Sequence, residues 1–125
     1  VYKEGVAKAA NLCTKEYFYA GIEYMYQRIR KPQIIVFSDD IPWVLENMTF
    51  PKGTLYESGD DPVWEKMRLM SACKHFVISN STFSWWAQDL SRHKGKIVVA
   101  PSTWRRQGYD GHSLYDKAWK LIPVK

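Results

Sequence analysis

Residues 75–86 read HFVISNSTFSWW, and the order of residue types in this stretch predicts the fold. The run from His75 to Ile78 is apolar and typical of a buried strand. Small polar residues follow, and from Phe83 to Leu90 large side chains recur with the spacing of a helix. A strand, a polar turn and a helix start make up the geometry with which α/β folds bind phosphate, because unpaired amides and the helix dipole favour an anion there.

Ser81 and Thr82, at the predicted helix start, have two interpretations. Their hydroxyls could donate to a bound phosphate beside the helix amides. They could equally be plain capping residues, because Ser, Thr and Asn are preferred at any helix N-terminus. The stretch alone leaves both interpretations open.

The rest of the chain alternates between predicted strands and helices. Two further apolar runs, QIIVFS at residues 33–38 and KIVVA at residues 96–100, are continuous, as in strands covered on both faces of a parallel sheet. This alternation with short connections indicates βαβ units and a Rossmann-like α/β fold with flanking helices. We expect residues 33–37, 75–78 and 96–99 to be neighbouring parallel strands, so that residues 38–40 and 79–82 meet at one edge. The remaining predicted elements are helices at residues 15–30, 43–48 and 62–72, and a short strand at residues 54–56.

The pattern becomes weaker after Trp104. Residues 105–112 resemble a loop. Residues 113–120 predict a short helix, with Leu114, Ala118 and Leu121 facing inward.

Composition indicates one folded domain. The chain has 125 residues, 46% of them hydrophobic, which suffices for a core and argues against disorder. It begins at Val1, and we expect it to be part of a longer protein. The net charge of +5 favours an anionic ligand, although the basic residues are mostly scattered. Cys13 and Cys73 lack the spacing of a zinc site, and we expect free thiols in a reducing compartment.

Four ordered sequence blocks resemble those of glycosyltransferase family 11, the α-1,2-fucosyltransferases that use GDP-fucose. The resemblance extends from about Glu16 to Trp104. The blocks are FSDDI at residues 37–41 followed by Trp43, LMSACKH at residues 69–75, SNSTFSWWA at residues 79–87, and KIVVAP at residues 96–101 followed by Trp104.

The resemblance implies a fold and an activity. It implies that residues 1–125 are a single C-terminal, donor-binding domain, the nucleotide-binding half of a GT-B-type enzyme whose N-terminal domain is missing here. The implied reaction transfers fucose from GDP-fucose to a galactose-terminated glycan acceptor in α-1,2 linkage, without a metal or another cofactor and without a nucleic-acid partner. A bacterial-type enzyme in the cytoplasm or at the cytoplasmic face of the membrane is expected.

The resemblance also implies site residues. Asp39 and Asp40 have three interpretations: a helix cap, a divalent-metal ligand, or, as in the related enzymes, an acceptor for the donor's base or ribose. Ser81, Thr82, Phe83 and Ser84 correspond to a family segment in which small polar residues hold the GDP phosphates and the aromatic residue lies near guanine. We expect His75, at the start of its strand, to lie at the sheet edge opposite the ligand, in a structural or donor-shell role.

One departure from the family concerns catalysis. The family has an H-x-R-R-x-D-like motif whose arginine holds the β-phosphate of the leaving GDP. No stretch of this sequence matches it, because Arg105 and Arg106 lack the preceding strand and the histidine. The catalytic residues are therefore unknown, and this chain alone is expected to be inactive.

Two other functional classes fit parts of the sequence. A non-catalytic nucleotide-binding or regulatory α/β module would have a similar strand pattern, because fold does not determine function. An RNA-binding domain would explain the positive charge and the aromatic residues, but leaves FSDD and SNSTFS unexplained. A serine hydrolase is disfavoured because the sequence has no G-x-S-x-G elbow.

Overall fold

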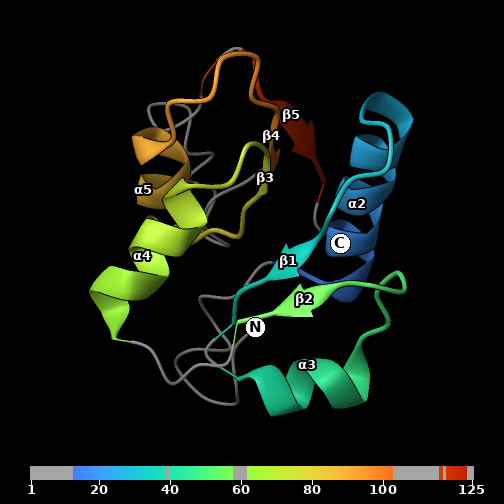
Figure 1. The fold of residues 1–125 in the computed structure, drawn as a ribbon. Coiled ribbons are helices and arrows are strands. Elements are labelled where there is room, and N and C mark those ends of the chain that lie inside the picture. The colour runs from blue at the N-terminus through green and yellow to red at the C-terminus, as the bar shows by residue number, and fades with distance from the viewer. Residues whose placement is uncertain (1–12, 39, 58–61, 103–115, 117, 124–125) are drawn as a thin grey trace.

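The helices lie around two small sheets (Figure 1). The computed structural model describes residues 13–38, 40–57, 62–102, 116 and 118–123. Thr14 caps the helix that begins at Lys15, since its hydroxyl accepts from the backbone N–H of Tyr17 at 3.2 Å. The helices in the described residues are α2 (Lys15–Arg28), α3 (Ile41–Asn47), α4 (Val63–Ser71) and α5 (Thr82–Leu90).

All described strand pairs are parallel, which confirms the predicted sheet type. One sheet has the order β1-β2 and the other has the order β3-β4-β5. In the second sheet Phe76 pairs with Val98 and Val77 with Val99. The strands are β1 (Ile35–Val36), β2 (Leu55–Tyr56), β3 (Phe76–Val77), β4 (Val98–Pro101) and β5 (Lys120–Ile122).

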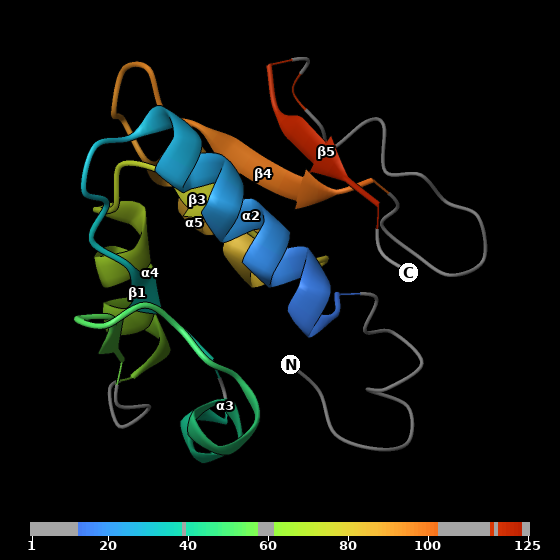
Figure 2. The ribbon, with the colours of Figure 1, turned by 90° about the vertical axis from the view of Figure 1, so that its right-hand side faces the viewer.

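The β3-β4-β5 sheet is covered on both faces (Figure 2). Helix α2 lies against one face, where Tyr17 and Met25 form a buried cluster with Val99. Helix α5 covers the other face, where Ala87 is buried against Phe76 and Val98. This sandwich explains why the sequences of β3 and β4 are continuously apolar rather than alternating.

Gly21 allows α2 to approach the sheet closely. A Cβ atom at this position would lie 2.6 Å from Cγ1 of Val77, which is closer than van der Waals contact permits. The absence of a side chain therefore sets the distance between the helix and β3.

The predicted adjacency of the strands is correct for one pair and wrong for the other. The β3–β4 pairing is as expected, but β1 pairs with β2 and forms no ladder with β3. Side chains of β1 and β3 line a cavity that lies between them. Periodicity identified the apolar strands, but it carries no information about which strand is the hydrogen-bonded neighbour.

The predicted C-terminal helix is also wrong where the structure describes it. Lys120 begins strand β5, which adds to the edge of β4 with Ala100 opposite Leu121. Leu121 is 38% exposed rather than turned inward. Pairing with β4 overrides the weak helical pattern of this segment. The predicted loop at residues 105–112 and residues 113–115 and 117 of that helix lie outside the described residues.

A buried hydroxyl joins α2 to the strand ends of the larger sheet. The Tyr17 side chain is 2% exposed, and its hydroxyl donates to the carbonyl oxygen of Ile78 at 2.5 Å, with the Val99 carbonyl at 3.3 Å. Ile78 comes directly after β3, where the chain turns into the polar loop. This contact therefore fixes the position at which that loop begins.

Replacing this hydroxyl tests its contribution to stability. Tyr17→Phe keeps the ring and leaves buried carbonyl groups with one donor fewer, so we expect a loss of about 1–3 kcal/mol in the free energy of unfolding. Tyr26→Phe is the matched control, because Tyr26 on the same helix is 43% exposed. Urea denaturation measures both variants, and equal stabilities would contradict the role given to Tyr17.

Candidate functional site

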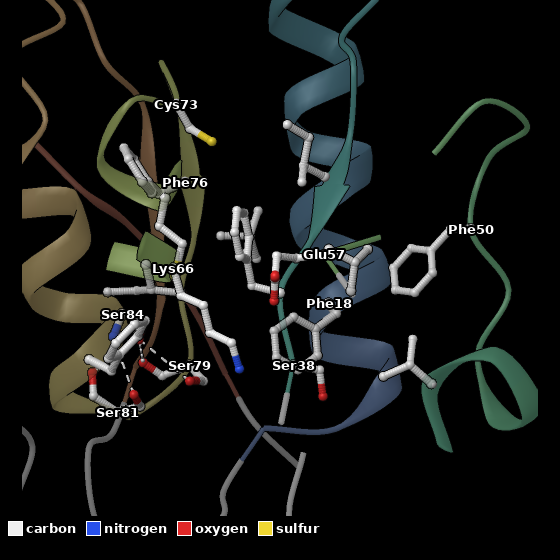
Figure 3. Close-up of a pocket in the computed structure, with 18 of the residues that line it drawn as sticks. Phe18, Ser38, Phe50, Glu57, Lys66, Cys73, Phe76, Ser79, Ser81 and Ser84 are labelled. Carbon is white, nitrogen blue, oxygen red and sulfur yellow. Dashed lines mark hydrogen bonds between the residues drawn. The ribbon is translucent and has the colours of Figure 1, made fainter. Parts of the chain in front are cut away.

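A cavity of about 470 Å³ lies between β1 and β3 (Figure 3). Its volume falls within the range of roughly 300–1,000 Å³ typical of small-molecule sites. Most of its wall is apolar, whereas Ser38, Ser79 and Ser81 lie together at one end. Ser38 follows β1 and Ser79 follows β3, so the carboxyl ends of both strands face one end of the cavity, even though the strands belong to different sheets. Open α/β folds bind ligands at this edge.

The loop from Ser79 to Ser81 is held by its own hydrogen bonds. Ser84 is 7% exposed, and its hydroxyl lies 3.0 Å from the carbonyl oxygen of Ser81 and 3.2 Å from that of Ser79. Ser84 therefore closes the turn from inside. The hydroxyl hydrogen of Ser84 is directed to the loop backbone. The predicted contact of Ser84 with the donor nucleotide stays a prediction.

Ser81 is the N-cap of α5. Its Oγ accepts from the backbone N–H of Ser84 at 3.2 Å, and its carbonyl oxygen accepts the first helical bond from Trp85. The capping interpretation thus describes the geometry of Ser81, but it does not exclude ligand binding, since a hydroxyl that accepts one bond can still donate another. The first amides of α5, those of Thr82 and Phe83, have no helical acceptor by geometry.

The other predicted residues of this segment are placed differently. Phe83 is half-buried and lines the cavity near the serines. Thr82 begins α5, but its side chain lies outside the description. Trp85 packs against the core and Trp86 is 52% exposed.

Asp40 is a helix cap in this structure. Its Oδ1 accepts from the backbone N–H of Trp43 at 3.2 Å, and its own N–H donates to the Ser38 hydroxyl at 3.0 Å. Asp40 thus follows the cavity-lining Ser38, but it is not among the described residues that line the cavity. Asp39 lies outside the described residues. A donor contact of either carboxylate stays a prediction.

His75 lines the cavity at a distance from the serines along β3, on the side of the strand start. Its Nδ1 accepts from the backbone N–H of Ile97 at 2.9 Å, so the side chain extends the β3–β4 ladder by one bond. Burial, His93 and Lys74 lower the pKa of His75 below its ordinary value of 6.5, which keeps the acceptor nitrogen neutral. A structural role, one of the two expected, accounts for this geometry.

Sequence reasoning missed several polar residues along the cavity. Glu57, the residue after β2, is buried at 8% exposure, and Lys66 lies on α4. Ser38 and Ser79 also line the cavity; the sequence placed them at the shared strand edge but did not name them as ligand contacts. Their position directly after predicted strands was a usable signal for the serines and for Glu57, whereas Lys66 resembles any polar residue of an amphipathic helix.

Several classes of site are not seen in the described part of the chain. Within the described ranges, no group of three or more His, Cys, Asp or Glu side chains is arranged to hold a metal ion. Cys13 and Cys73 are free, as expected, and burial raises the pKa of the Cys13 thiol to about 11. No helix among the described residues is long and apolar enough to cross a membrane.

Comparison with known proteins shows the family to which this chain belongs. The model of a family described as "Glycosyl transferase family 11" matches residues 2–123. The chain belongs to glycosyltransferase family 11. The resemblance carried by the four sequence blocks is thereby confirmed. No solved structure gives a significant match.

The chain resembles bacterial and primate enzymes. It is 34% identical to an "Alpha-1,2-colitosyltransferase" of Escherichia coli over 78% of this chain and 34% of that protein. It is 40% identical to the "O-antigen biosynthesis glycosyltransferase WbnK" of Escherichia coli over 71% of this chain and 30% of that protein. A "Galactoside alpha-(1,2)-fucosyltransferase 1" of Leontocebus fuscicollis is 27% identical over 60% of this chain and 21% of that protein. The matched region spans about a third or less of these relatives.

The role of His75 predicts a pH dependence of stability. Because its pKa in the folded state lies below 6.5, the unfolded chain takes up this proton more readily, and stability falls as pH decreases below about 6.5. In the His75→Asn variant the side-chain amide oxygen takes the place of Nδ1 as acceptor for the Ile97 N–H, and it does not titrate. We expect its urea midpoint to fall less between pH 7.5 and pH 5.5 than that of the unmodified protein. Identical losses in both proteins would contradict this role of His75.

Proposed function

We propose that this chain is the donor-nucleotide-binding part of an α-1,2-fucosyltransferase that uses GDP-fucose. The observation that carries the proposal is the serine-rich end of the cavity, where the Ser79–Ser81 loop leads into the N-terminus of α5. Hydroxyls, helix amides and the positive end of a helix dipole are the groups that bind a diphosphate in α/β folds. The apolar wall of the cavity, to which Phe83 contributes beside the serines, is suited to a purine base.

The proposal also assigns the architecture and the cellular context. The chain would be the C-terminal Rossmann-like half of a GT-B-type enzyme, with the nucleotide between it and an N-terminal domain. The proposed donor contacts are Asp39 or Asp40, together with Ser81, Thr82 and Phe83, and no metal is required. Two free cysteines suit a reducing compartment, which supports a location in the cytoplasm or at the cytoplasmic face of a membrane.

The proposed reaction is an inverting transfer. A base removes the proton from O2 of a terminal galactose, this oxygen bonds to C1 of fucose, and the bond from C1 to the β-phosphate oxygen breaks. Negative charge then accumulates on the departing GDP, and the α5 N-terminus would stabilise part of it. The base and the arginine of the family motif match no residue of this chain, so the proposal places them in the N-terminal domain.

A non-catalytic nucleotide-binding module is the second candidate. The absence of the arginine motif from this sequence favours it. Such a module would bind GDP without any transfer by the full-length protein. Activity of the full-length protein therefore separates the two candidates.

The double variant Ser81→Ala with Thr82→Ala tests the diphosphate contact. Charge-assisted hydrogen bonds contribute about 1.5–3 kcal/mol each, so we expect GDP binding by the full-length protein to weaken tenfold or more, which corresponds to ~1.4 kcal/mol. Binding should not vanish, because the backbone amides remain. Calorimetric titration with GDP measures the effect, and thermal melting reports stability.

Thr14→Ala is the matched control for that experiment. It removes the N-cap of α2, where the Thr14 hydroxyl accepts from Tyr17, and should cost stability of about 0.5–2 kcal/mol without changing GDP affinity. If the double variant behaves like this control, Ser81 and Thr82 are only capping residues.

The isolated chain tests where catalysis resides. Because no stretch matches the arginine motif, we expect the purified 125-residue chain to transfer no fucose from GDP-fucose to a galactoside. A radiolabelled-donor assay measures the transfer, with the full-length protein as positive control. Turnover by the isolated chain would place the catalytic groups within these residues.

A further inference from the structure

Lys66 lies on the same side of the cavity as the serine loop and brings a positive charge there. It lies on α4, is half-buried, and lines the cavity together with residues of β1, β3 and α5. Figure 3 shows its side chain directed towards the end of the cavity at which Ser38, Ser79 and Ser81 lie. Lysines on helix surfaces usually extend their amino group into bulk water, so this direction requires an explanation.

Ion pairing within the described protein does not explain the direction of Lys66. No described carboxylate lies within 4.0 Å of its amino group, whereas the adjacent Glu65 pairs at 2.7 Å with Arg68 along the helix. Glu57 is the other described lining residue with a formal charge, and Figure 3 shows it nearer the middle of the cavity. The amino group of Lys66 therefore adds positive charge to the serine end of the cavity.

We propose that Lys66 binds the diphosphate of the donor nucleotide, beside the N-terminus of α5. This inference rests on the function proposed above and adds a residue to it. Serine hydroxyls and helix amides carry only partial charges, and a diphosphate is strongly anionic, so a nearby ammonium group complements it. An ammonium group is a compact charge with three hydrogen-bond donors, so it can pair with phosphate oxygens in several orientations.

The proposal predicts that Lys66 contributes to binding of the phosphates and not to binding of the base or the ribose. Its removal should weaken the binding of GDP but not that of guanosine, which has the same base and ribose and no charge. A residue that merely supports the cavity wall would affect both ligands alike. The ratio of the two dissociation constants therefore separates a phosphate contact from a structural effect.

The experiment compares Lys66→Met with Lys94→Met in the full-length protein. Methionine keeps most of the apolar length of the lysine side chain, so the cavity wall is conserved while the charge is lost. Lys94, in the turn after α5, is exposed and does not line the cavity, so it controls for the same change in net charge. Lys66→Arg restores a positive charge. Calorimetric titration with GDP and with guanosine measures affinity, and thermal melting confirms that each variant is folded.

We expect Lys66→Met to bind GDP at least tenfold more weakly, with guanosine binding unchanged, whereas Lys94→Met binds both ligands normally and Lys66→Arg recovers part of the affinity. Unchanged GDP binding by a folded Lys66→Met variant, or an equal loss for GDP and guanosine, would overturn the assignment of Lys66 while leaving the proposed function intact. Failure of the unmodified protein to bind GDP would instead overturn the proposed function, and the role of Lys66 with it.

Discussion

The hydrogen bond from the Tyr17 hydroxyl to the Ile78 carbonyl is the contact on which the candidate site depends. It joins residues that are 61 positions apart, and it does so in a buried place where an unpaired carbonyl would be costly. Because Gly21 lets α2 lie close to Val77, the phenol reaches the point at which β3 ends. The polar loop thus starts from a fixed position, and this also fixes where the serine end of the cavity lies.

The loop itself combines a structural task with the capacity to bind an anion. Ser84 closes the turn from inside, and Ser81 caps α5 through its oxygen lone pairs. The hydroxyl hydrogen of Ser81 and the first helix amides are the donors that such a cap leaves for a ligand. Lys66 approaches from the neighbouring helix α4, so a diphosphate at this place would meet partial charges from the loop and a full charge from the lysine.

Local sequence patterns predicted the elements better than their arrangement. Continuous apolar runs identified β1, β3 and β4, and the residues from His75 to Trp86 predicted the strand-to-helix turn correctly, because these features depend on neighbours along the chain. The pairing of β1 with β2, the strand at Lys120 and the position of Lys66 depend on residues far away in sequence, and periodicity does not encode them. Asp40 illustrates a further limit, since a cap and a ligand contact require the same residue type.

A crystal structure of the full-length protein with GDP would test the central claim most directly, namely that the end of the cavity between β1 and β3 binds the donor diphosphate. The account predicts phosphate oxygens within hydrogen-bond distance of Ser81, of the first amides of α5 and of the amino group of Lys66, with guanine against the apolar wall to which Phe83 contributes. A diphosphate bound elsewhere, with the Ser79–Ser81 loop making no ligand contact, would contradict it.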